Sequence, residues 1–443
     1  MVRRSGYLTL ALLTVAATAG TARAQTPPAD APPPEAPPPA ADAPVAAPPL
    51  AEPPPPPPPP PPPAVQQPVP PPAPSGSSSP FAPFKIDANG NSIRIGLLFQ
   101  PAYRTATSNA PGVDGLSQNL FLRRTRILVG GTLFGKIDYF LDTDYPNLFL
   151  ATPEGNPNAA MDPTPYTNNK GGPGMYIQDA FITAKPIEGE FKDAFKIDAG
   201  FMLPPMAHNA VQGAGTLYSL DYYANSFLHS NVFGGTAPVG RDLGVQLRGL
   251  VVGGLIEYRV GLFQGLRQPQ TADRIASHNF FRATGRVQIN LLDPEPGFFY
   301  SGTYLGAKKV LSLGVSGDLQ GDYKYFAGDV FADMPMGPGV FTLQANYAHW
   351  NGDGFVALPK EWAVMGEVGY NFNTIVSPLV RAEYLDATAA SGTVTKTARY
   401  GGGVNWWAFG HNSNVKTLYQ YVKVDGAPKG ANQIDVQWQL YFY

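Results

Sequence analysis

The stretch ANQIDVQWQLYFY, from Ala431 to Tyr443, alternates between polar and apolar residues from Gln433 onward. Polar residues occupy the odd positions from Gln433 to Gln439, and apolar residues occupy the even positions from Ile434 to Phe442. Successive side chains of a β-strand point to opposite faces. The stretch is therefore predicted to be a strand with one apolar face and one hydrated face.

The first residues predict export from the cytoplasm. Arg3 and Arg4 precede an apolar run from Leu8 to Ala17, and Ala22-Arg23-Ala24 has the small-x-small pattern of a cleavage site. Residues 1–24 are therefore predicted to be a secretory signal peptide. The apolar run is too short to be a membrane-spanning helix, which needs roughly 20 residues.

Residues 25–84 are predicted to be a disordered, proline-rich linker. Half of residues 25–80 are proline, with an unbroken run from Pro53 to Pro63. Proline has no backbone N–H and a fixed φ, so such a segment is expected to be polyproline II or disordered. It is either a stiff spacer or a periplasmic tether that touches the cell wall or another envelope protein.

The composition narrows the class of protein. Charged residues make up 14% of the chain, against roughly 25% in a typical soluble domain. The formal charge is -2, and a nucleic-acid partner is not expected because that would require a basic surface. Cysteine is absent, which excludes disulfides, thiolate metal sites and cysteine catalysis.

From Ile93 onward alternation dominates, and helical periodicity is hard to find. We predict sixteen strands, at residues 92–104, 119–133, 134–145, 174–186, 195–203, 240–250, 253–264, 279–292, 305–318, 323–334, 339–351, 361–373, 376–388, 396–409, 413–426 and 431–443. Most odd-numbered connections are long and most even-numbered ones are short, as expected when one barrel end faces the cell exterior and the other the periplasm. Connections 187–194 and 293–304 are longer than that pattern predicts.

Alternation alone does not separate a membrane barrel from a soluble sandwich. An open sheet of some sixteen strands is rare, and closure removes its exposed edges. We therefore predict an all-β fold, a transmembrane antiparallel β-barrel of about 16 strands over residues 85–443, preceded by the disordered proline-rich segment. Its location would be the bacterial outer membrane.

Several motifs resemble the phosphate-selective porin O and P family of Gram-negative outer membranes. They are Phe121-Leu122-Arg123-Arg124-Thr125-Arg126 with Gly130-Gly131, Gly240-Arg241-Asp242-Leu243-Gly244-Val245-Gln246, Tyr258 to Gly265, Asn290-Leu291-Leu292-Asp293-Pro294-Glu295, and Gly401-Gly402-Gly403-Val404-Asn405-Trp406. The similarity covers most of residues 92–443. It implies a sixteen-stranded, trimeric porin.

A barrel of this size leaves a water-filled channel, and the arginines on its inward faces are candidate anion contacts. The candidates are Arg94, Arg104, Arg124, Arg126, Arg248, Arg259, Arg282, Arg286 and Arg381. A guanidinium donates two parallel hydrogen bonds to the oxygens of a phosphate or carboxylate. These groups could therefore pass an anion along the channel. The alternative is that they pair with acids of the same wall and give a mixed-charge general pore.

Arg123 and Arg124 cannot both point inward on a regular strand, so one is expected at a rim or a bulge. The stretch 204–239 is the candidate for a loop that folds into the channel and narrows it. Its candidate residues are His208, Tyr218, Asp221, Tyr222, Tyr223 and His229. Residues 146–173 could fold into the channel instead, and both stretches could also lie outside the barrel and cover its mouth.

No catalytic, cofactor or metal motif accompanies the scattered histidines, so we expect no enzyme, no cofactor and no metal. The predicted function is passive diffusion of small hydrophilic solutes and ions through an outer-membrane porin, with a preference for anions such as phosphate left open. The alternative is a structural outer-membrane anchor whose proline-rich arm contacts the periplasm or cell wall. The expected partners are outer-membrane lipid, small solutes or anions, and two further copies in a homotrimer.

Overall fold

The computed structural model of the protein describes residues 83–108, 114–150, 175–223, 240–266, 280–352, 360–389 and 391–443. The predicted signal peptide, nearly all of the predicted linker and His229 lie outside the described residues. No helix among the described residues is long and apolar enough to cross a membrane.

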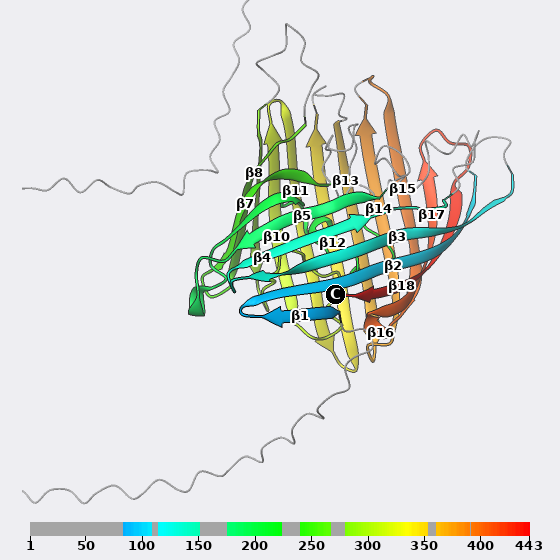
Figure 1. The fold of residues 1–443 in the computed structure, drawn as a ribbon. Coiled ribbons are helices and arrows are strands. Elements are labelled where there is room, and N and C mark those ends of the chain that lie inside the picture. Colours follow the sequence, from blue (N-terminus) through cyan, green and yellow to red (C-terminus); the bar gives the residue numbers. More distant parts are fainter. Residues whose placement is uncertain are drawn as a thin grey trace, which may run out of the picture. The chain divides into compact units, whose positions relative to one another are not determined.

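The described residues form a closed, antiparallel β-barrel of sixteen strands, as predicted (Figure 1). The first eight barrel strands are β2 (Asn91–Thr107), β3 (Leu116–Leu133), β4 (Ile137–Asp144), β5 (Tyr176–Ala184), β6 (Lys196–Met202), β7 (Asp242–Val251), β8 (Ile256–Phe263) and β9 (Arg282–Asn290). The second eight are β10 (Val310–Gln320), β11 (Tyr323–Met336), β12 (Gly339–Asn351), β13 (Lys360–Phe372), β14 (Val376–Thr388), β15 (Val394–Trp406), β17 (Ser413–Val424) and β18 (Ala431–Phe442). Each strand pairs with its neighbours in the chain, and β18 closes the barrel on β2.

Two short strands were not predicted. β1 (Phe84–Ala88) forms a hairpin with the start of β2 and lies near the chain end in Figure 1. Its turn is Asn89-Gly90, both with positive φ, a pair typical of tight hairpin turns. The second, β16 (Ala408–His411), lies in the connection between β15 and β17.

The barrel is apolar outside and polar inside, the reverse of a soluble domain. On β10 the side chains of Leu313, Val315 and Leu319 are exposed, while those of Ser316 and Asp318 are buried. The same alternation predicted for the last strand places Gln433, Asp435, Gln437 and Gln439 inside and Ile434 and Trp438 outside. Closed barrels satisfy all backbone groups within a bilayer, so this is a transmembrane barrel.

The predicted difficulty at Arg123 and Arg124 is resolved by a β-bulge. Gln100 of β2 pairs with Arg124, whereas the next residue, Pro101, pairs with Leu122. Arg123 is thus the extra residue, and both arginine side chains are buried inside the barrel. A bulge changes the facing of the strand beyond it, which is what allows two consecutive residues to point into the lumen.

The two ends of the barrel differ. The barrel end at which the C-terminus lies carries short turns such as Gly337-Pro338. Most connections at the opposite end are long. Two connections matter for the lumen: residues 203–241 between β6 and β7 start from the long-loop end, and residues 291–309 between β9 and β10 start from the short-turn end.

Candidate functional site

The inner wall of the barrel is built from arginine–carboxylate pairs. Representative pairs are Arg104–Asp435 at 2.6 Å, Arg248–Asp198 at 2.7 Å, Arg259–Glu257 at 2.7 Å, Arg286–Asp329 at 2.6 Å and Arg381–Glu383 at 2.7 Å. Arg282 contacts both Asp242 and Asp318 at 3.2 Å. Every one of these side chains is at least nine-tenths buried. Charge inside the lumen is therefore largely balanced within the wall.

The described part of the β6–β7 connection, residues 203–223, lies inside the barrel; we call it the first insert. Its backbone carbonyls accept hydrogen bonds from the wall on several sides. Lys416 Nζ donates to Leu217 O at 2.5 Å, Gln439 Nε2 to Gly215 O at 2.8 Å, and Asn405 Nδ2 to Tyr218 O at 2.7 Å. These donors come from the adjacent strands β15, β17 and β18. Arg286 of β9 donates to Met206 O at 3.1 Å, so the insert is tied to two separate parts of the wall.

Asp221 anchors the far end of the first insert to the bulge. Its carboxylate accepts hydrogen bonds from Arg123 Nε at 2.6 Å and from Arg124 Nη2 at 2.5 Å. Burial alone would raise the pKa of Asp221, but the two guanidinium groups outweigh burial and hold this pKa well below its usual value. Arg381 Nη1 adds hydrogen bonds to Ser219 Oγ at 2.7 Å and to the Asp221 carbonyl at 2.6 Å.

The β9–β10 connection, residues 291–309, is the second insert, and its middle part enters the barrel, where Glu295, Phe298 and Tyr300 are buried. Its carbonyls are held by arginines of the neighbouring wall. Arg259 donates to Phe298 O at 2.7 Å and to Gly297 O at 3.1 Å, and Arg248 donates to Pro296 O at 3.0 Å. The unusual length of this connection is thus explained by its position within the lumen.

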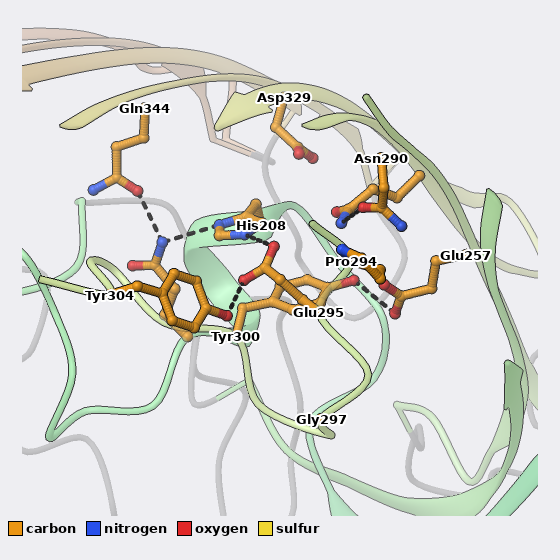
Figure 2. Close-up of polar contacts among 12 residues, drawn as sticks. His208, Glu257, Asn290, Pro294, Glu295, Gly297, Tyr300, Tyr304, Asp329 and Gln344 are labelled. Atoms are coloured by element: carbon orange, nitrogen blue, oxygen red, sulfur yellow. Dashed lines mark hydrogen bonds and ion pairs between the residues drawn. The ribbon is translucent and has the colours of Figure 1, made fainter. Parts of the chain in front are cut away.

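The two inserts meet and bond to each other. Gln212 and Tyr300 form a parallel β-bridge, and Gly302 N donates to Thr216 O at 3.0 Å. Figure 2 shows the side-chain contact beside this bridge: His208 of the first insert and Glu295 of the second lie 2.9 Å apart. Both side chains are 1% exposed.

His208 is fixed on all sides. Gln212 lies 3.0 Å from His208 Nδ1. Tyr304 donates to Glu295 at 2.6 Å (Figure 2). The imidazole stacks between Tyr300 and Phe331, with ring-centre distances of 4.5 and 4.1 Å. The amide nitrogen of Gln212 is a donor, so Nδ1 accepts and the Nε2 proton points at Glu295. This set of contacts closes the junction between the inserts.

A chamber of about 210 Å³ remains between the inserts and the wall formed by β2, β3, β4, β5 and β18. Its charged lining is Arg126, Asp142, Asp179 and Arg241. Its aromatic lining is Phe140, Phe299, Tyr300, Tyr304, Tyr441 and Tyr443. The C-terminal Tyr443 thus lies at the lumen, where its ring also packs 4.5 Å from the Arg94 guanidinium.

The structure places the residues proposed from the sequence as follows. The arginines Arg104, Arg124, Arg126, Arg248, Arg259, Arg282, Arg286 and Arg381 are buried inside the barrel, and Arg94 lies over Tyr443. His208, Tyr218, Tyr222 and Tyr223 are buried in the first insert, with Asp221 at its anchor. Their roles as anion contacts and as a constriction remain predictions.

Sequence reasoning missed several residues that shape the lumen. Lys416 lies on the polar face of β17 between Asn414 and Gln420, so the alternation that selected the arginines could also have selected it. Glu295 and Tyr300 belong to a connection without periodicity, and only its length was a signal. Among the described residues, no group of His, Asp and Glu could hold a metal ion.

No protein-family model matches the chain, and no curated protein matches it. The resemblance to the phosphate-selective porin O and P family therefore stays a prediction. Solved structures of outer-membrane proteins are similar to the chain over about four-fifths of its length.

The anion-selective porin from Comamonas acidovorans shares 12% identity at a TM-score of 0.49, with 80% of this chain and 100% of that chain covered. The outer-membrane channel DcaP of Acinetobacter baumannii shares 12% identity at a TM-score of 0.47, with 82% and 100% covered. OmpT of Vibrio cholerae shares 11% identity at a TM-score of 0.45, with 81% and 100% covered. Likeness at this level carries no argument about function, which has to come from the geometry of the lumen.

Proposed function

We propose that the protein is an outer-membrane porin for passive diffusion of small hydrophilic solutes and ions. The observation that carries the proposal is the closed sixteen-stranded barrel with a charged and polar inner wall. A barrel of that strand number is wide enough for an aqueous channel. The two inserts would set the narrowest part, and the size and field of that part decide what passes.

The pairing of wall arginines with carboxylates affects how strongly the pore would prefer anions. Arg286 is held in a bidentate pair by Asp329, at 2.6 and 2.8 Å, and most other wall arginines have comparable acidic partners. A guanidinium already engaged by a carboxylate offers less attraction to a passing phosphate. A mixed-charge pore with modest selectivity is therefore favoured. A true preference for phosphate, and membership of the phosphate-selective family, have less support. A homotrimer is part of the same proposal.

The second candidate is a structural anchor in the outer membrane. Its support is the extent to which the inserts fill the lumen: Arg286 alone contacts Met206 O of the first insert at 3.1 Å and Tyr300 of the second at 3.3 Å. A plugged barrel would hold the proline-rich arm at the membrane without conducting.

Single-channel recording in planar lipid bilayers separates the two candidates. The porin proposal expects stepwise conductance in KCl, smaller than that of an open sixteen-stranded barrel because the inserts occupy the lumen. The reversal potential under a salt gradient, measured with chloride and then with phosphate, should give permeability ratios of a few-fold at most. Insertion without any conductance would reject the porin and support the anchor.

A further inference from the structure

The chamber between the inserts and the wall has an aromatic corner. Phe140 of β4 packs edge-to-face against Phe299 of the second insert and against Tyr443, each with ring centres 5.5 Å apart. Tyr441 joins the same lining. Polar solutes gain little from such a surface, whereas a planar ring can pack into it with edge-to-face contacts.

The chamber lining also carries charges of both signs. Arg126 lies 3.2 Å from Asp142, and Arg241 lies 3.3 Å from Asp179. Asp142 and Asp179 are direct neighbours across β4 and β5. Two guanidinium groups and two carboxylates thus face the cavity, from β3, β4, β5 and the residue before β7. Arg126 also contacts Asp144 at 3.1 Å.

The Arg126–Asp142 pair leaves hydrogen-bonding capacity unused. Asp142 Oδ1 and Arg126 Nε are buried and have no hydrogen-bond partner among the residues that the structure describes. The two pairs are also longer than the Arg123–Asp221 contact that anchors the first insert, which is 2.6 Å. Buried polar atoms normally find partners, so this wall is suited to a ligand or water that supplies them.

We propose that the chamber is a binding site for a small aromatic zwitterion, of the chemical class of an aromatic α-amino acid. An ammonium group would meet Asp142 and Asp179, a carboxylate would meet Arg126 and Arg241, and the ring would enter the corner of Phe140 and Phe299. A solute with a carboxylate alone would compete with the aspartates for the guanidinium groups and leave buried charge unpaired. Such unpaired buried charge is costly. A solute with an ammonium group alone would compete with the guanidinium groups for the aspartates and would likewise leave buried charge unpaired.

The size of the chamber fits one ring and a short polar chain. An apolar cavity of roughly 150 Å³ accommodates benzene, and the chamber measures about 210 Å³. The difference leaves room for a short charged chain but not for a second ring. This proposal rests on the proposed pore function, because the solute would reach the chamber through the lumen.

The test uses the full-length protein in planar bilayers and records interruption of the KCl current by four solutes. Phenylalanine is the zwitterion with a ring, 3-phenylpropionate and 2-phenylethylamine each keep one charge, and leucine keeps both charges without a ring. We expect the half-blocking concentration of phenylalanine to be about tenfold lower than those of the other three, since one well-made charged contact is worth about that factor. Equal blocking by 3-phenylpropionate would overturn the zwitterion site.

Two variants distinguish direct contact from a structural role. Asp142→Asn should abolish the advantage of phenylalanine over 3-phenylpropionate, and Phe299→Leu should weaken phenylalanine blocking while leaving leucine blocking unchanged. The control is Asp435→Asn, which removes an equally buried carboxylate from the Arg104 pair elsewhere on the wall. Equal losses in Asp142→Asn and Asp435→Asn would reject the assignment.

The failures of the two proposals are distinguishable. If the barrel inserts and carries no KCl current, the pore function fails and the solute site falls with it. If it conducts but phenylalanine blocks no better than the single-charge solutes, the pore stands and only the chamber proposal fails. Should Asp142→Asn not fold, the solute series on the unaltered protein decides alone.

Discussion

A single extra residue on β3 organises the anchor of the first insert. Without the bulge at Arg123, one of the two neighbouring arginines would face the lipid, and Asp221 would keep only one guanidinium partner. With it, both side chains reach the same carboxylate at 2.5 to 2.6 Å. A bulge can re-aim a side chain in this way, and here it produces a triad that fixes the end of a lumen segment.

Removing the carboxylate of this triad should release the insert. In Asp221→Asn, Arg123 and Arg124 lose their acidic partner, and breaking a buried pair costs about 3–5 kcal/mol. We expect the barrel to fold and the single-channel conductance at neutral pH to rise severalfold. Asp114→Asn is the control, because Asp114 pairs with Lys429 at the exposed rim, and its conductance should be unchanged. Unaltered conductance in Asp221→Asn would show that the anchor does not limit the channel.

The same triad sets a pH dependence. The pKa of Asp221 is held below its usual value of 3.8 by Arg123 and Arg124. A lowered carboxyl pKa gives a contribution that is complete above the usual value and is lost only as the pH falls through the lower, folded-state value. Conductance should therefore stay constant from about pH 7 to about pH 4 and rise only in stronger acid. Asp221→Asn should lack this acid step, and a step near neutral pH would point to another group.

At the residue scale, the sequence predicts the strand face on which a side chain lies and offers pairing with acids of the same wall as an alternative, but most individual partners depend on other strands. Strand alternation identified Arg282 and Arg286 as inward, because the period of two is a local property. Their partners, such as Asp318 and Asp329, come from neighbouring strands, and the register that joins them is set by the whole sheet. The contact between Arg104 and Asp435 spans nearly the entire barrel sequence, so no local pattern reveals it.

At the scale of elements, the two inserts form one structure inside the lumen. Each enters from a different barrel end, and their contact depends on close backbone approach at Gly302. A Cβ at Gly302 would lie 2.5 Å from Tyr218 N and 2.9 Å from Leu217 Cα. Both are backbone atoms that cannot rotate away, so the position tolerates only glycine while the inserts stay together.

Gly302→Ala should separate the inserts locally. Overpacking of this kind costs typically about 1–3 kcal/mol, and the expected result is a higher conductance with a lower temperature of unfolding in detergent. The control is Gly285→Ala on β9, where the nearest atom to an added Cβ is 3.9 Å away. If both variants behave like the unaltered protein, contact between the inserts is not needed for the closed lumen.

The sixteen barrel strands could be predicted from the sequence, whereas β1 and the inserts were harder to predict. All sixteen barrel strands were predicted close to their observed bounds, because alternation continued for ten residues or more in most of them. β1 was missed even though Asn89-Gly90 marks its turn, since the strand is only five residues long and exposed throughout. Residues 204–239 are a candidate inward loop from the sequence, whereas residues 291–309 have no periodicity and only their length indicated that they differ from a short turn.

For the molecule as a whole, the inverted distribution of polarity is the property on which membrane insertion depends. On β10, Val315 lies in the middle of the strand with 53% of its surface exposed, and Leu319 lies one residue from the end with 40% exposed. Both face outward on the same strand. Within a bilayer, they would therefore sample different depths of the same lipid-facing wall.

Introducing lysine at these two positions measures that depth directly. A lysine on the lipid face costs about 2–4 kcal/mol at the bilayer midplane and about 0–1 kcal/mol near the interface. Val315→Lys should therefore lower the free energy of unfolding, measured by denaturant titration in lipid vesicles, by the larger amount, and Leu319→Lys should lower it by the smaller. The pair is matched in strand, face and substituent, so only depth differs. Equal and small effects at both positions would mean that this wall faces water or protein, and the assignment of a lipid-embedded barrel would fail.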